Sequence, residues 1–61
     1  MAKLLIIDDE KSIRKTLREI LEYEKYQVDE ASDGAEGIAM IQKEKYDIVL
    51  CLKLAHITSN N

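Results

Sequence analysis

The sequence contains no proline, no tryptophan and no phenylalanine, and its only cysteine is Cys51. A single cysteine excludes an internal disulfide, and no cluster of cysteine and histidine suggests a zinc site. No apolar run is long enough for a membrane span or for the hydrophobic part of a signal peptide. We therefore expect a cytoplasmic protein that has no membrane partner.

The 61 residues allow one small domain of marginal stability, because a chain of this size buries only about 60% of its unfolded surface. The formal net charge of −3 argues against a nucleic-acid partner. The charges are unevenly spread, since residues 47–61 carry only Asp47 and Lys53. The last quarter of the chain is thus nearly neutral, and its first half is strongly apolar.

Residues 3–10 join four consecutive apolar side chains to three consecutive carboxylates, Asp8, Asp9 and Glu10. The apolar run predicts a strand buried on both faces, as in a parallel sheet. The carboxylates would emerge at the end of this strand, where open α/β sheets bind ligands. Mg²⁺ prefers such oxygen ligands. The alternative is that these residues only cap the next helix.

Residues 12–25 are predicted to form an amphipathic helix that packs through one apolar stripe. Its other face carries pairs of opposite charge four residues apart. Two tyrosines near its end are expected to cover the edge of the core. The stripe consists of Ile13, Leu17, Ile20 and Leu21; the pairs are Glu10–Arg14, Lys15–Glu19 and Arg18–Glu22; the tyrosines are Tyr23 and Tyr26.

Residues 27–32 predict a short polar strand at an edge of the sheet. A turn follows, in which Asp33 and Glu36 have the spacing of a helix N-terminal cap. The next helix is expected over residues 35–43, with an inner stripe of Ala35, Ile38, Ala39 and Ile41.

Within this second helix, Gly37 permits a close approach to the sheet, and Met40 is interpreted as flexible packing. Residues 47–52 predict a third, wholly apolar strand, in which Cys51 acts as a small buried hydrophobe. For His56, a position on the surface is expected rather than metal ligation.

The resulting β-α-β-α-β order predicts an α/β fold. Right-handed crossovers place the two helices on opposite faces if the first strand is central, which gives the strand order 2-1-3. With Asp-Asp-Glu after the first strand, "ASDGAEGI" and "YDIVLC" in place, the chain resembles the receiver domain of bacterial response regulators in two-component signalling. The resemblance covers residues 3–54 and implies half of a flavodoxin-like, doubly wound parallel sheet.

The resemblance also implies a function in a phosphorelay, as a signalling module rather than an enzyme. Family members hold Mg²⁺ with the acidic pair, here Asp8 and Asp9 with Glu10 adjacent. A sensor histidine kinase passes a phosphoryl group to an aspartate at the end of the third strand. The family's first helix contributes to kinase docking, which would fall on Ile13, Arg14 and Leu17 in this sequence.

The sequence departs from the family at the phosphoacceptor. The family pattern has an aspartate near Cys51 and Leu52, whereas no Asp or Glu follows Asp47 here. Asp47 is no substitute, because about five residues at roughly 3.3 Å each separate it from the strand's far end. We therefore expect no phosphorylation at the usual place and only weak Mg²⁺ binding.

The pattern covers about half of the usual domain, so residues 1–54 are interpreted as a truncated receiver and residues 55–61 as an irregular tail. A natural variant, a frameshift or truncation product and an engineered fragment all remain open, with truncation favoured. The third strand would then have an unpaired apolar edge, which is a template for another chain. We expect a homodimer or higher oligomer, joined through Ile48, Val49, Leu50 and Leu52 of this strand or over the uncovered face of the first helix. Dimerisation as the only activity, without signalling, is the alternative function.

Overall fold

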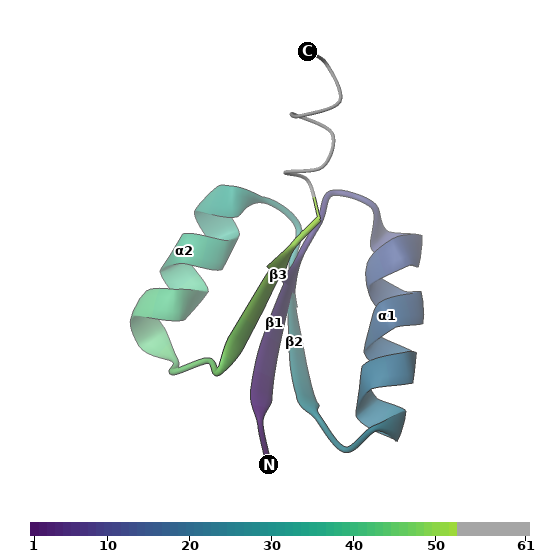
Figure 1. Cartoon of the computed structure of the whole chain (residues 1–61). Helices are drawn as coiled ribbons and strands as arrows, with labels where there is room; N and C mark the ends of the chain where they lie inside the picture. The colour runs from purple at the N-terminus through teal and green to yellow at the C-terminus, as the bar shows by residue number, and fades with distance from the viewer. Residues whose placement is uncertain (53–61) are drawn as a thin grey trace.

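The computed structural model describes residues 1–52. Three parallel strands form one sheet in the order β2-β1-β3, with one helix on each face (Figure 1). This order and the placement of the helices confirm the prediction. The expected tail and His56 lie outside the described residues. The elements are β1 (Lys3–Ile7), α1 (Lys11–Tyr23), β2 (Gln27–Ala31), α2 (Gly34–Lys43) and β3 (Ile48–Cys51).

The central strand β1 supplies both halves of the core, because alternate side chains of a strand point to opposite faces of the sheet. Leu4 and Ile6 pack with Val28 on the α1 side. Leu5 and Ile7 pack with Ala31 on the α2 side. Leu5 and Ile6 are fully buried, as expected for a strand covered on both faces.

Helix α1 packs through only part of its predicted stripe. Leu17 and Leu21 contact the core, but Ile13 is 39% exposed and Ile20 is 55% exposed. At about 100° per residue, both isoleucines lie on the flank of the helix away from Arg14 and Arg18. Because these arginines bind Glu30 of β2, the helix is displaced towards β2 and leaves its isoleucine flank uncovered.

One of the two tyrosines near the end of α1 was also placed wrongly. Tyr26 packs against the core as predicted. Tyr23, the last residue of the helix, is 83% exposed and is not among the residues packed against the core. Of the predicted charge pairs, Arg18 and Glu22 form an ion pair of 3.1 Å.

Helix α2 is rotated by nearly half a turn from the predicted orientation. Gly37 is buried and Met40 contacts the core, whereas the predicted inner stripe is exposed. The cause is the close approach at Gly37, where a Cβ would lie 2.4 Å from Ile7 Cδ1. The side of the helix that carries Gly37 therefore faces the sheet. The wrongly assigned residues are Ala35, Ile38, Ala39 and Ile41.

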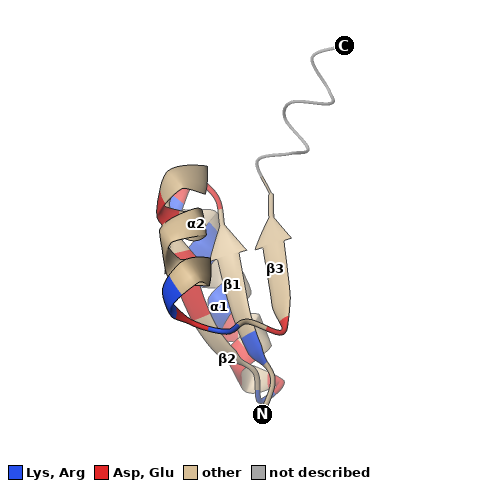
Figure 2. Ribbon diagram, turned by 90° about the vertical axis from the view of Figure 1, so that its left-hand side faces the viewer, with Lys and Arg blue, Asp and Glu red and all other residues tan. Residues whose placement is uncertain are grey.

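The two edge strands differ in how well they are covered. Both helices pack mainly on β1 and β2. Strand β3 stands apart from the helices in the view onto the face of the sheet and bears no charged side chain (Figure 2). Ile48 and Val49 are 39% and 43% exposed. The third strand is therefore the least protected part of the sheet, although it was predicted as an apolar strand like β1.

A polar cluster joins the amino ends of the strands, opposite the carboxylates of residues 8–10. The Tyr46 hydroxyl donates to Asp29 Oδ2 over 2.6 Å, and the Lys3 ammonium pairs with Glu44 and lies over the Tyr46 ring. The backbone N–H of Lys3 donates to Asp47 Oδ2 over 2.7 Å. Burial, followed by the hydrogen bond to Asp29, raises the pKa of Tyr46 to about 12. This cluster holds the start of β3 to β1 and β2.

Candidate functional site: an acidic corner without a third carboxylate

Asp8 is the buried residue of the candidate site, with 2% of its surface exposed. Its backbone N–H donates to the Ala31 carbonyl over 3.1 Å, so it continues the pairing of β1 with β2. Its Oδ2 accepts the backbone N–H of Glu10 over 3.3 Å. The carboxylate thus braces the turn between β1 and α1, as a short polar side chain does at a helix start.

Asp9 and Glu10 are exposed beside it at the same edge of the sheet. We call Asp8, Asp9 and Glu10 the acidic corner. Glu10 is the N-cap residue of α1 through its backbone, and its side chain makes no capping hydrogen bond. The Glu10 side chain therefore does not cap the helix, whereas the Asp8 carboxylate contacts the Glu10 N–H just before the helix begins.

Arg14 contacts the main chain of the acidic corner and connects it to β2. Its Nη1 donates to the Asp8 carbonyl over 2.6 Å, and its Nε donates to Glu30 Oε1 over 3.0 Å. Arg18 Nη1 donates to the other oxygen of Glu30 over 3.1 Å. Burial works to raise the pKa of Glu30, but the guanidiniums of Arg18 and Arg14 outweigh it, so the pKa lies below its usual value. This clamp connects the turn after β1 to β2.

Asp33, a further acidic residue at this edge, serves as a helix cap. Its Oδ1 accepts the backbone N–H of Glu36 over 2.8 Å at the start of α2. The Glu36 carboxylate accepts the N–H and the hydroxyl of Ser32, and the backbone bond lowers the pKa of Glu36. The predicted cap at Asp33 is confirmed, and its reciprocal bond reaches one residue further back than in the usual capping box.

The end of β3 lies directly beside the acidic corner. Cys51 pairs with Ile7 in the register of the two strands, and the Leu52 N–H donates to the Ile7 carbonyl over 3.0 Å. Cys51 packs on the α2 side of the sheet and Leu52 on the α1 side. The strand next to Asp8 thus ends in a thiol and an isobutyl group.

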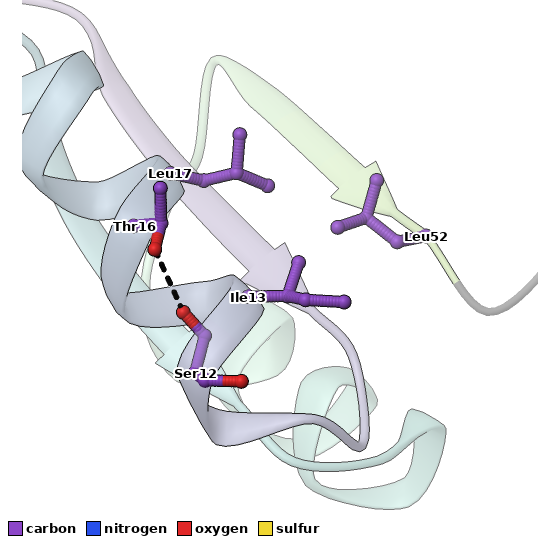
Figure 3. Close-up of a pocket in the computed structure, with 5 residues that line it drawn as sticks. All are labelled: Ser12, Ile13, Thr16, Leu17 and Leu52. Atoms are coloured by element: carbon purple, nitrogen blue, oxygen red, sulfur yellow. Dashed lines mark hydrogen bonds between the residues drawn. The ribbon is translucent and has the colours of Figure 1, made fainter.

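An apolar groove opens next to Leu52, between α1 and the uncovered face of β3. It has a volume of about 490 Å³ and is lined by Ser12, Ile13, Thr16, Leu17 and Leu52. Figure 3 shows Ile13, Leu17 and Leu52 converging on it, while the Thr16 hydroxyl is bonded back to the Ser12 carbonyl. The groove contains two of the three residues predicted as a partner surface. The third, Arg14, is turned towards Glu30 instead.

The side chains of the corner fit a magnesium site only in part. Asp8 and Asp9 supply the hard oxygen ligands that Mg²⁺ requires. Within residues 1–52, however, no three His, Cys, Asp or Glu side chains are grouped so that they could hold one metal ion. The end of β3 contributes sulfur and hydrocarbon where a further oxygen ligand would be needed.

Comparison with known proteins identifies the family. Residues 4–55 match the family described as the response regulator receiver domain. The chain belongs to this family. Its receiver fold is shared with chemotaxis protein CheY4 of Vibrio cholerae, with a TM-score of 0.78 and 41% identity. The match covers 80% of this chain and 41% of that structure.

Two curated relatives of this receiver chain come from Bacillus subtilis. It is 48% identical over 48 residues to transcriptional regulatory protein ResD, covering 79% of the chain and 20% of ResD. It is 40% identical, again over 48 residues, to sporulation initiation phosphotransferase F, and covers 39% of that protein. The chain therefore spans less than half the length of these relatives. The resemblance to flavodoxin-like receivers of two-component systems is confirmed.

Two features of this receiver domain escaped sequence reasoning. The clamp of Arg14 and Arg18 on Glu30 joins residues that are 16 and 12 positions apart, so pairing rules within one helix could not find it. The groove depends on the rotation of α1 relative to the sheet.

No helix in the described part of this receiver is long and apolar enough to cross a membrane.

Proposed function

We propose that this chain is a receiver-type module of a two-component system that binds a signalling partner but does not accept a phosphoryl group at the end of β3. The observation that carries the proposal is the contact of Leu52 with the Ile7 carbonyl, immediately before Asp8. A carboxylate is a competent phosphoryl acceptor, whereas the leucine side chain has no nucleophilic atom. No acidic residue follows Asp47 in the sequence, so none can replace the missing acceptor carboxylate.

The proposed role is that of a binding module in the cytoplasm, without catalytic activity of its own. The relatives carry the names of a transcriptional regulatory protein and of a sporulation initiation phosphotransferase. The partner class that we propose is a sensor histidine kinase. Its contact surface on this chain would be the exposed part of the apolar groove, centred on Ile13 and Leu17.

Magnesium is expected to bind weakly at Asp8 and Asp9. Bound there, the ion would supply positive charge to neutralise phosphoryl oxygens. Asp8 keeps one carboxylate oxygen engaged with the Glu10 N–H, and Arg14 holds its carbonyl, so the main chain of the corner is preorganised. What limits the affinity is the missing oxygen ligand from β3.

A matched pair of variants tests the role of the β3 end. Leu52→Asp places a carboxylate next to Asp8, and Val49→Asp adds the same charge to the exposed part of β3, about 10 Å away at 3.3 Å per residue. In Mg²⁺ titrations followed by amide chemical shifts, we expect Leu52→Asp to bind roughly tenfold more tightly than the original chain, a difference of about 1.4 kcal/mol. The Val49→Asp variant should not.

The proposal about the β3 end fails if the original chain binds Mg²⁺ as tightly as Leu52→Asp does. It also fails if Val49→Asp gives the same gain, because the effect would then be a general one of added charge.

Kinase binding is tested with the phosphorylated dimerisation domains of a panel of histidine kinases. We expect at least one to form a complex while its phosphohistidine persists. Ile13→Asp should weaken this complex, and Ile20→Asp should not, since Ile20 is an exposed isoleucine of the same helix that lies two turns from Ile13 and does not line the groove. Equal loss in both variants would contradict the proposed contact surface.

Dimerisation as the only activity is the second candidate function. It is favoured by the exposed apolar side chains of β3, Ile48 and Val49. A chain that self-associates but binds none of the kinases would support this alternative over the signalling module.

A further inference from the structure

The outer edge of β3 is an open hydrogen-bonding surface. Within the described residues, β3 has β1 on one side and no strand on the other. The backbone N–H and C=O groups that point away from β1 form the row of donors and acceptors with which another extended strand can pair. The chemistry of this edge therefore specifies an extended chain as its occupant.

The distribution of charge favours a second copy of the same chain at this edge. Residues 48–52 are uncharged, so two copies can approach here without like-charge repulsion, although each chain carries a net charge of −3. The opposite edge of the sheet is different, because β2 carries Asp29 and Glu30. Joining two β2 edges would place these carboxylates near their own counterparts, which is unfavourable.

We propose that two copies of this chain join through β3 in an antiparallel pair about a two-fold axis perpendicular to the sheet. The inference specifies the geometry of the second candidate function and rests on it. The result is a continuous sheet of order β2-β1-β3-β3-β1-β2. Such an axis keeps both α1 helices on one face of the sheet and both α2 helices on the other.

The symmetry restricts the register. Directly opposed residues of an antiparallel pair point to the same face, and side chains alternate along each strand. Leu50 and Leu52 face α1, as Ile48 does by alternation, while Cys51 and Val49 face α2. A pair centred on Leu50 satisfies this rule and uses all of residues 48–52. Leu50 then faces Leu50 of the second copy, and Val49 faces Cys51 of the second copy.

This register also accounts for the apolar groove. Ile48 of the second copy would lie opposite Leu52, at the open side of the groove that Figure 3 shows. Ile48 is 39% exposed in the single chain, and the pairing would bury it against an apolar neighbour. The exposed surfaces of β3 and of the groove thus belong to one continuous interface.

Cysteine pairing tests the register in the 61-residue chain itself. Copper phenanthroline oxidises cysteines to a disulfide only when the two Cβ atoms lie close together. The key variant is Leu50→Cys in a Cys51→Ser background. Its matched control is Val49→Cys in the same background, because both introduce one cysteine on β3. A third variant, Val49→Cys with Cys51 retained, probes the predicted cross-pair.

We expect roughly tenfold more disulfide-linked dimer for the Leu50 variant than for its Val49 control, since opposed Cβ atoms lie about 5 Å apart and diagonal ones 7–8 Å. Retaining Cys51 should restore crosslinking to Val49→Cys. Sedimentation of the original chain should show a dimer.

A monomer at high concentration would overturn both the dimerisation function and this geometry. A dimer in which Leu50→Cys does not crosslink would overturn the geometry alone. A dimer in which the Val49 control crosslinks best would replace it with a pair centred on Val49.

Discussion

The two edge strands of this receiver domain differ in composition and in burial, and the more polar strand is the more buried one. Strand β2 has the sequence QVDEA, yet Val28 and Ala31 are buried, and Asp29 and Glu30 are partly covered and bonded. Strand β3 has the sequence IVLC, yet its first two residues are exposed. The polar strand is thus the protected one.

The cause lies in the helices rather than in the strands. Arg14 and Arg18 bind Glu30 and displace α1 towards β2, while Gly37 lets α2 approach Ile7 and Ala31. Both helices therefore cover β1 and β2, and the first residues of β3 remain exposed. A hydrophobic run predicts a strand, but the residues on the helices decide which strand is buried.

Matched valine substitutions on the two strands give the largest expected difference. Val28→Ala removes two methyl groups from a side chain that is 2% exposed and should lower the free energy of unfolding by about 2 kcal/mol. Val49→Ala, at a position that is 43% exposed, should change it by less than about 0.5 kcal/mol. Urea unfolding of both variants measures the difference. Equal losses would show that β3 is as well packed as β2.

Breaking the clamp should have the next largest effect. Glu30→Gln weakens two charge-assisted hydrogen bonds and should cost about 1 to 2 kcal/mol, because Glu30 is only 22% exposed. Glu22→Gln, at a carboxylate that is 47% exposed, should cost less than about 1 kcal/mol. Urea unfolding at neutral pH compares the two variants. A larger loss for Glu22→Gln would contradict the role assigned to the clamp.

The clamp also predicts the sign of a pH effect. Since the pKa of Glu30 is lower in the folded chain, its contribution is complete above the unfolded value of 4.5. It is lost as the pH falls from there through the folded pKa. The Glu30→Gln variant should therefore lose less stability than the original chain over this acid range. Parallel acid titrations of the two chains, followed by circular dichroism, test this.

A second pH effect, of the opposite sign, is expected at alkaline pH, at the amino ends of the strands. The pKa of Tyr46 is raised from 10.0 to about 12, so the fold favours the protonated phenol. Its contribution is complete below pH 10 and is lost as the pH rises from about 10 to about 12. Tyr46→Phe should remove this dependence. An unchanged alkaline slope in that variant would show that Tyr46 does not couple to stability.

Much of the fold could be predicted because the decisive signals are local. The run from Leu4 to Ile7 predicts a central strand, and the Asp33 cap marks the start of a helix. With that strand in the centre, the order is 2-1-3, and the handedness of crossovers then places the two helices on opposite faces. The rotation of each helix could not be predicted, because it depends on Arg14 finding Glu30 on another element and on Gly37 meeting Ile7.

The candidate site was predicted less completely than the fold. The sequence places Asp8 and Asp9 at the end of β1 and leaves the end of β3 without a carboxylate. It could not indicate that Asp8 is buried and accepts the Glu10 N–H, or that Arg14 donates to the Asp8 carbonyl. These properties depend on how the turn after β1 places Asp8, Glu10 and Arg14 in the folded chain.

The central claim is that this receiver chain keeps its acidic corner but has no phosphoryl acceptor beside it. The direct test is intact-mass spectrometry after incubation with acetyl phosphate and Mg²⁺, with a complete receiver domain treated in parallel. The expected spectrum shows the complete domain gaining a phosphoryl group and this chain unchanged. A stable aspartyl phosphate on Asp8, Asp9 or Asp47 would contradict the claim.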